Sequence, residues 1–256
     1  MRLRAFPLLI LLTLLTSCSG NDPFLPFGEE EEGPGTAPGA ANPFGIYTGH
    51  IESDEGFIDL VGHISAAGDG RFLTYSGESI LLAVPRQPSF EGTIRISDDS
   101  GNVASGVTAG TLVPRDQLQL DFIANDAVGS RSGRLAAVNN IAAAERPLSL
   151  SELAGEWYGG ETFLRIEESG RLSGASREYC LLSGQLPARP TNSVVAFPAV
   201  IDCGEGEQPG QGLLSLFTIL SDPLLGPLLP SEQTILLISV RYGDEVSISG
   251  YIPTSN

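Results

Sequence analysis

Residues 45–64 read GIYTGHIESDEGFIDLVGHI, and this stretch decides the fold. Two runs of alternating apolar and polar residues flank the polar segment SDEG. Alternation with a period of two residues is typical of a half-buried β-strand, and a short polar segment with Gly between two such runs is typical of a hairpin turn. With a four-residue loop, His50 faces Asp59 across the hairpin and His63 faces Ile46.

Short runs of the same kind recur along the chain and predict an all-β fold, an antiparallel barrel or sandwich. Helical periodicity is nearly absent, and the one helical candidate is the turn at 149–155, with Ser149 or Ser151 as its cap. The predicted strands are IYTGHI, FIDLVGHI, TIRI, QLQLDFI, TFLRI, QTILLISV and EVSISGYI, and the predicted turns lie at 53–56, 98–102, 168–170 and 242–245.

Three segments of the first half of this β region are similar to three segments of the second half, in the same order. The pairs are GIYTG at 45–49 with GEWYGG at 155–160, DGRFL at 69–73 with SGRLS at 169–173, and RSGRL at 131–135 with ISGYI at 248–252. We therefore predict two similar small β domains, at 45–140 and 151–256, joined by a linker at 141–150. One larger barrel or sandwich is the alternative.

The first seventeen residues have the parts of an export signal. Arg2 and Arg4 precede an apolar stretch at 6–15, and small residues separate this stretch from Cys18. About ten apolar residues are too few to span a bilayer core of roughly 30 Å as a helix. We therefore expect residues 1–17 to be a signal peptide that is removed on export.

The tetrapeptide Leu15-Thr16-Ser17-Cys18 resembles the lipobox of bacterial lipoproteins. The resemblance implies that Cys18 becomes the first residue and is lipidated, with a diacylglyceryl thioether and an amide-linked acyl chain such as palmitate. Several acyl chains anchor stably, because each buried methylene contributes about 0.8 kcal/mol. Ser19 follows the cysteine, so the Asp that acts as a retention signal at this position is absent. By analogy with known sorting rules, this favours the outer membrane of a bacterial cell envelope. An ordinary cleaved signal peptide with a chance cysteine is the alternative.

Residues 18–44 are rich in Gly, Pro and Ala and include the acidic run Glu29–Glu32. This composition predicts a disordered tether behind the lipidated cysteine, with a mean span of about 25–30 Å. Three Pro-Phe pairs in the tether are either docking points for a partner or residues that rest on the bilayer interface or on the protein's own domain.

The chain is strongly acidic. Its formal net charge is −17, and all 14 basic residues are Arg. Removal of the signal peptide leaves 12 basic against 31 acidic residues, a formal charge of −19. Such a surface repels nucleic-acid phosphates and anionic headgroups, so we expect no nucleic-acid partner. A functional interpretation of this acidity is the capture of cations or basic partners. The alternative is that it serves only solubility.

Two cysteines remain once Cys18 is lipidated. An exported protein reaches an oxidising compartment, so Cys180 and Cys203 are expected to form a disulfide. In the chain-entropy account a bond across a loop of this length stabilises the fold by roughly 3 kcal/mol. A zinc site needs three or four ligands, and His50 and His63 are far off in sequence. We therefore expect neither a metal site nor a cofactor.

Residues 152–174, ELAGEWYGGETFLRIEESGRLSG, resemble the opening strands of calycin-type barrels, the lipocalins and avidins. In those barrels a Gly-x-Trp opens the first strand, and the tryptophan plugs one end. The resemblance implies this structural role for Trp157. It covers about twenty residues, and the further tryptophans of the avidin pocket and the later lipocalin signatures are not evident here. A closed antiparallel barrel has no free edges and can hold one small apolar ligand.

Catalytic motifs are missing from the sequence, and we expect no enzyme activity. There is no nucleophile elbow, Walker loop, dinucleotide fingerprint or His-Glu-x-x-His. The segment GVTAG at 106–110 reads as a turn between strands. His50 with Asp59 is a candidate His-carboxylate general base or half of a metal site. We favour the alternative, a solvated cross-strand pair on a half-exposed sheet.

The segment SDPLLGPLLPS at 221–231 places four leucines among prolines and a glycine, which preclude a stable helix or a central strand. Leucines in an irregular loop either cover a core or remain exposed. They are therefore either a cover over a barrel end or a tip that contacts a partner or membrane. The leucines are Leu224, Leu225, Leu228 and Leu229, and together with Trp157 they are the candidate contact residues.

Taken together, the sequence favours a lipid-anchored lipoprotein of the bacterial cell envelope, on the periplasmic side or the surface. Its expected role is that of a non-catalytic binding or scaffold subunit that acts by contact with an envelope protein partner. The alternative is a carrier of a small apolar ligand in a calycin-like β barrel.

Overall fold

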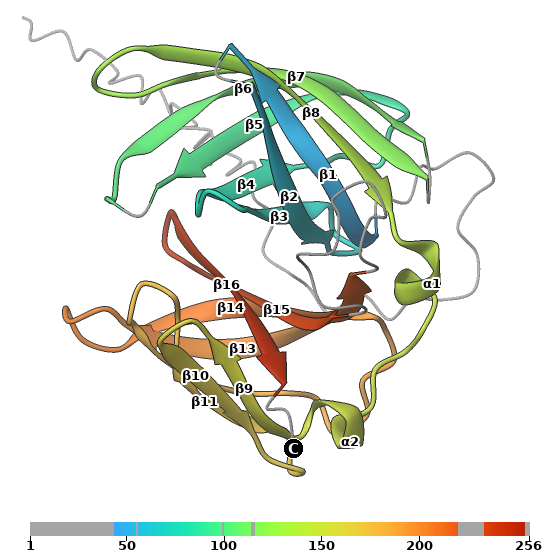
Figure 1. The fold of residues 1–256 in the computed structure, drawn as a ribbon, viewed down its shortest axis with the longest axis vertical. Coiled ribbons are helices and arrows are strands. Elements are labelled where there is room, and N and C mark those ends of the chain that lie inside the picture. Colours follow the sequence, from blue (N-terminus) through green and yellow to red (C-terminus); the bar gives the residue numbers. More distant parts are fainter. Residues whose placement is uncertain (1–43, 55, 99, 114–115, 220–232, 254–256) are drawn as a thin grey trace, which may run out of the picture. The chain divides into compact units, whose positions relative to one another are not determined.

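The computed structural model describes residues 44–54, 56–98, 100–113, 116–219 and 233–253. Within them the chain forms two closed antiparallel barrels, each with eight strands joined in chain order (Figure 1). The prediction of an all-β fold with two similar small β domains is confirmed. Both barrels belong to one compact unit of the chain, Thr36–Asn256.

The first barrel closes where its first strand pairs with its last, through pairs such as Ile51 with Leu135. Its strands are β1 (Gly45–Ser53), β2 (Gly56–Ile64), β3 (Asp69–Thr74), β4 (Ser79–Ala83), β5 (Ser89–Ser97), β6 (Val103–Val113), β7 (Gln117–Asn125) and β8 (Ser130–Asn139).

The second barrel closes where its last strand pairs with its first, through Ile252 with Tyr158 and Pro253 with Trp157. Its strands are β9 (Gly155–Gly159), β10 (Thr162–Ile166), β11 (Arg171–Ala175), β12 (Leu181–Gln185), β13 (Val194–Asp202), β14 (Gln208–Ile219), β15 (Gln233–Tyr242) and β16 (Glu245–Pro253). The three similar segment pairs fall on the first, third and eighth strands of the two barrels.

Two short helices lie between the barrels in sequence, α1 (Ile141–Ala144) and α2 (Leu150–Leu153). The helical turn predicted at 149–155 is therefore present as α2, and Ser149 is its N-cap. The Ser149 backbone N–H donates to the Glu152 carboxylate at 3.1 Å, and this contact satisfies one of the backbone groups that a helix start leaves open. In the described residues, no helix is both long enough and apolar enough to span a bilayer.

The first hairpin has the register that its turn predicts, with His50 opposite Asp59 and Ile46 opposite His63. The expectation of a turn at 106–110 is wrong, because these residues lie inside β6. Gly106 is required there by close packing: a Cβ atom would lie 1.8 Å from the Ile123 carbonyl oxygen of the neighbouring β7.

Alternating side chains fill the barrel interiors. Strand β7 shows the rule, because Leu118, Leu120, Phe122 and Ala124 point inward and are buried while the residues between them are not. An eight-stranded barrel has an interior just wide enough for side chains to fill. Each barrel accordingly has its own apolar core, one including the neighbouring rings of Tyr47 and Phe72 and the other including Trp157.

Several strands are buried on both faces. In β2 every residue from Leu60 to Ile64 is buried, which breaks the alternation seen at its start. The outward side chain of Val61 belongs to a third apolar cluster that contains residues of both barrels. Its buried members are Ile46, Val61 and Leu81 of the first barrel and Val194, Leu213, Phe217, Leu237, Val246 and Ile248 of the second. Side chains on the outer faces of both barrels thus form one apolar contact, in which β16 lies against β3 and β4.

Candidate functional site

Two groups of predicted site residues lie outside the described residues. One is the lipidation site Cys18, and the other is the leucine loop with Leu224, Leu225, Leu228 and Leu229.

Trp157, the remaining candidate contact residue, lies in the core of the second barrel. Only 5% of its surface is exposed, and its indole N–H donates to the Leu153 carbonyl of α2 at 2.9 Å. The bond joins the start of β9 to the helix that precedes it. We find Trp157 among buried apolar side chains and not on the outer surface of the barrel.

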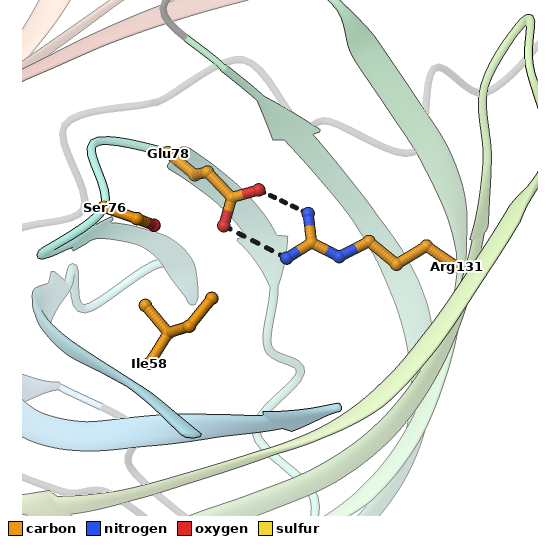
Figure 2. A pocket seen from close by; sticks show the side chains of 4 residues that line it. All are labelled: Ile58, Ser76, Glu78 and Arg131. Carbon is orange, nitrogen blue, oxygen red and sulfur yellow. Dashed lines mark hydrogen bonds and ion pairs between the residues drawn. The ribbon is translucent and has the colours of Figure 1, made fainter. Parts of the chain in front are cut away.

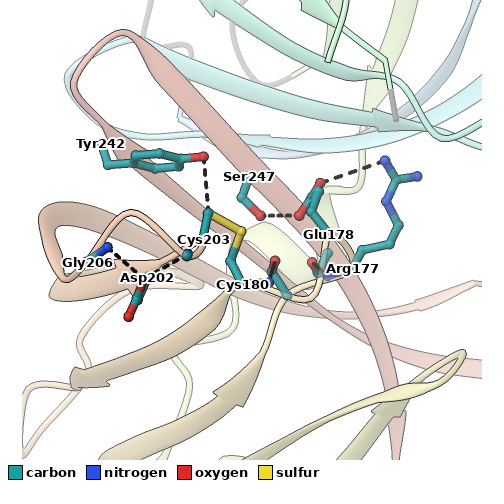
Figure 3. The surroundings of a disulfide bond; sticks show 11 residues. Arg177, Glu178, Cys180, Asp202, Cys203, Gly206, Tyr242 and Ser247 are labelled. Atoms are coloured by element: carbon teal, nitrogen blue, oxygen red, sulfur yellow. Dashed lines mark hydrogen bonds and ion pairs between the residues drawn. A yellow bond between two sulfur atoms is a disulfide. The ribbon is translucent and has the colours of Figure 1, made fainter. Parts of the chain in front are cut away.

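The predicted disulfide between Cys180 and Cys203 is present (Figure 3). The two cysteines stand immediately outside the pair Leu181–Asp202, which is the last pair of the β12–β13 hairpin. The bond therefore joins this hairpin at the end opposite its connecting loop. Tyr242 of β15 places its hydroxyl 3.6 Å from the Cys203 sulfur.

His50 is half-buried, and its ring meets the Phe57 ring edge-on with the centroids 5.3 Å apart. No group of three or more His, Cys, Asp or Glu residues in the described ranges is arranged to hold a metal ion.

His63 has a different environment, which the local sequence around it does not predict. It is fully buried between the barrels, and its two ring nitrogens lie 2.9 Å from the Ser215 hydroxyl and 2.7 Å from the Ser239 hydroxyl. A neutral imidazole has one N–H donor and one acceptor nitrogen, so two hydroxyls satisfy it completely. The first barrel supplies the ring, and strands β14 and β15 of the second supply the hydroxyls.

Arg71 lies beside His63 and is also fully buried. Its guanidinium donates to the Asp69 carboxylate at 2.5 and 3.0 Å, to the Gln211 carbonyl at 2.8 Å and to the Ser239 carbonyl at 3.2 Å. Donors that point in several directions suit the fixed fork of an arginine. We call Asp69, Arg71, His63, Ser215 and Ser239 the interbarrel cluster.

Chemically, a histidine within hydrogen-bond distance of two serines has the spacing of a base and a nucleophile. In the interbarrel cluster, however, His63, Ser215 and Ser239 each have no exposed surface. The cluster therefore connects the two barrels, and its hydroxyls do not face an open pocket. One sequence signal points to such burial: apolar runs without alternation in LVGHI, LLSLF and ILLISV are typical of strands covered on both faces.

Burial lowers the pKa of His63 to about 3, and the nearby positive charge of Arg71 acts in the same direction. The folded protein therefore does not protonate this ring between pH 6.5 and 3, whereas the unfolded chain does. The contribution of the neutral His63 ring to stability is therefore fully present above the unfolded pKa, and it is lost as the pH falls below that value.

We predict that this linkage removes about 2 kcal/mol of unfolding free energy between pH 7 and pH 5. Urea unfolding of the wild type and of His63→Gln at both pH values measures it, since the variant lacks the titrating ring. The wild type should lose about 2 kcal/mol more than the variant does. An equal pH dependence in the two proteins, or its loss in His50→Gln instead, would contradict the assignment.

A cavity of about 330 Å³ opens at one end of the first barrel, lined by Ile58, Ser76, Glu78 and Arg131 (Figure 2). Arg131 occupies an inward-facing position of β8, and Glu78 immediately precedes β4. Strands β4 and β8 are four positions apart in a ring of eight, so the pair spans the barrel mouth. The two side chains form a two-pronged ion pair, with one Nη2–Oε2 distance of 3.1 Å.

We predict that the ion pair between Glu78 and Arg131 couples the two residues by about 1 kcal/mol, since its side chains are 15% and 28% exposed. A double-mutant cycle with Glu78→Gln and Arg131→Gln, read by urea unfolding, gives this coupling. The more exposed pair of Asp121 with Arg134 is the control, with an expected value near zero. Equal coupling energies in both pairs would show that partial burial at the barrel mouth does not strengthen the pair of Glu78 with Arg131.

Comparison of the chain with family models, with curated proteins and with solved structures finds no match.

Proposed function

We propose that this protein is a bacterial lipoprotein, anchored through Cys18 in the outer membrane, and that it acts as a non-catalytic binding or scaffold subunit. The proposal combines the lipobox resemblance with one observation on the barrels. Their interiors are packed with apolar side chains from alternating positions, so the parts of their outer faces that are not buried between the barrels are the surfaces available for contact.

The cavity at the mouth of the first barrel is the observation that favours the alternative, a carrier of a small ligand. Its volume of about 330 Å³ lies at the lower end of the range typical of ligand pockets. Its lining is unlike that of an apolar pocket, however, because Glu78 and Arg131 form an ion pair across it and Ile58 is the apolar contributor. The lining therefore supports the scaffold more than an apolar-ligand carrier.

Purification of the full chain from detergent-extracted native membranes tests the proposal. We expect a stoichiometric envelope protein to co-purify, and mass spectrometry to find an acylated N-terminal cysteine. A small molecule present at one copy per chain, without a protein partner, would instead support the carrier. Recovery of Cys18→Ala with the membrane fraction in the same amount as the wild type would contradict the lipid anchor.

A further inference from the structure

A row of exposed apolar side chains crosses the outer face of the second barrel. Ile252 of β16 lies opposite Tyr158 of β9, and Tyr158 lies opposite Phe163 of β10. Each of these residues neighbours an inward-facing one along its strand, so all three point outward. They are 39%, 42% and 52% exposed, respectively.

The row continues over the next two strands. The register of β10 with β11 pairs Leu164 with Gly174, so the adjoining position sets Ala175 beside Phe163. Ala175 pairs in turn with Leu181 of β12, which is 64% exposed. Strands lie about 4.8 Å apart, so five strands give the row a length of about 19 Å. We call Ile252, Tyr158, Phe163, Ala175 and Leu181 the apolar row.

Tyr179 stands next to the apolar row, in the turn that precedes β12. Tyr179 is 65% exposed, and among the described residues it is the one other than glycine with a positive φ, at 62°. This conformation is uncommon for a bulky side chain. The turn accounts for it: the Tyr179 N–H donates to the Ser176 carbonyl at 2.9 Å, and the Ser176 N–H donates to the Cys180 carbonyl at 2.8 Å, the pattern that Gly170 completes in the preceding hairpin.

Carboxylates line the edges of the apolar row. The Tyr179 hydroxyl donates to Glu161 at 2.9 Å, and this bond raises the pKa of the tyrosine. Leu181 pairs with Asp202 at the far end of the row. On the other side Glu156 faces Arg165 in the next row of the sheet. Acidic groups thus exceed basic ones around an apolar centre.

Charge selects the occupant of this surface. A second copy of the chain would bring the same acidic edge and a formal charge of −17. The N-terminal segment would bring its own acidic run, Glu29–Glu32. Like charges brought together across an interface are unfavourable, whereas opposite charges steer two proteins together. A segment that offers both apolar side chains and arginine or lysine fits the surface best.

We propose that the apolar row is a docking surface for a basic, partly apolar segment of another envelope protein. This inference rests on the proposed scaffold function and names the contact surface and the chemistry of its partner. The apolar centre would supply the contact area, and the carboxylates would select for a basic segment.

Binding of two defined peptides to the full chain tests the proposal. One synthetic 12-residue peptide alternates Leu with Arg and the other alternates Leu with Glu, and fluorescence anisotropy reports binding. The triple variant Tyr158→Ser, Phe163→Ser, Leu181→Ser should bind the Arg peptide at least tenfold more weakly than the wild type. The Glu peptide should bind neither protein.

The matched control is Val107→Ser with Ile123→Ser, an exposed apolar pair that faces outward from β6 and β7 of the first barrel. This variant should bind the Arg peptide as the wild type does. Tyr179→Gly serves if the triple variant folds poorly, because it removes the ring and the backbone strain together. We expect it to keep its melting temperature and to bind the Arg peptide about threefold more weakly. Equal binding by the wild type, the triple variant and Tyr179→Gly, or tight binding of the Glu peptide, would overturn the proposal.

Photo-crosslinking in native membranes separates this inference from the proposed function. A photoreactive phenylalanine analogue replaces Phe163 in one protein and Ile123 in the other. An adduct with a basic segment of another protein at 163 alone supports the docking surface. If the wild type co-purifies with a partner but position 163 gives no adduct, or one with a second copy, the docking surface is wrong and the scaffold stands. If no partner co-purifies, the proposed function itself fails.

Discussion

Replacement of Arg71 by alanine is expected to lower the free energy of unfolding by about 3–5 kcal/mol, the range for breaking a buried ion pair by removing one partner. The guanidinium has no exposed surface, and it is the partner of the Asp69 carboxylate, which is itself only 8% exposed. Without it, that carboxylate stays buried next to no positive charge. Gln211 and Ser239 also lose the donor to their carbonyl oxygens.

Urea unfolding measures the effect, and Arg134→Ala is the matched control. Arg134 forms an ion pair of 2.9 Å with Asp121, but its side chain is 59% exposed, so its loss should change the free energy of unfolding far less than the loss of Arg71 does. The double variant Asp69→Ala with Arg71→Met should be more stable than Arg71→Ala, because it leaves no unpaired carboxylate in the contact. Similar losses for Arg71→Ala and Arg134→Ala would show that the buried Arg71 contributes no more to stability than an exposed arginine, and that its bonds to Gln211 and Ser239 do not hold the barrels together.

The hairpins could be predicted because their information is local. In GIYTGHIESDEGFIDLVGHI the alternation gives the two strands and the SDEG turn fixes the register, which places His50 opposite Asp59 as observed. The same rule is wrong at 106–110. Glycines there allow a close approach of two strands, and nothing in the local sequence distinguishes this from a turn.

The interbarrel cluster could not be predicted from the sequence, because its contacts join distant residues. His63 and Ser239 are 176 positions apart, and Arg71 and Gln211 are 140 apart. Unbroken apolar runs do indicate that a strand is covered on both faces, but they do not name the partner strand. The disulfide is the exception among the long-range contacts, since only two cysteines remain to pair once Cys18 is set aside.

The candidate contact surface shows the same limit. Tyr158 and Phe163 are unremarkable as single exposed side chains, which are common on soluble proteins. They become a row only when the register of β16, β9 and β10 places them side by side. Barrel closure is therefore the step that sequence reasoning lacked, because it brings the last strand of the domain next to the first.

Replacement of Trp157 by alanine is expected to cost about 3–5 kcal/mol of unfolding free energy, the range for large-to-small changes in a core. The indole is 5% exposed and packs in the second barrel's apolar cluster, so its removal leaves a cavity. It also leaves the Leu153 carbonyl without the donor that joins α2 to β9. Both losses act at the strand that closes the barrel.

Two further substitutions separate these contributions. Trp157→Phe keeps most of the ring volume but loses the N–H donor, so it should cost about 1–2 kcal/mol. Tyr158→Ala changes the neighbouring residue, which points outward and is 42% exposed, and should cost about 1 kcal/mol or less. Urea unfolding of the three variants gives the order. If Trp157→Ala were no more harmful than Tyr158→Ala, Trp157 would not be a core residue, and the likeness to the end-plugging tryptophan of calycin barrels would lose its physical basis.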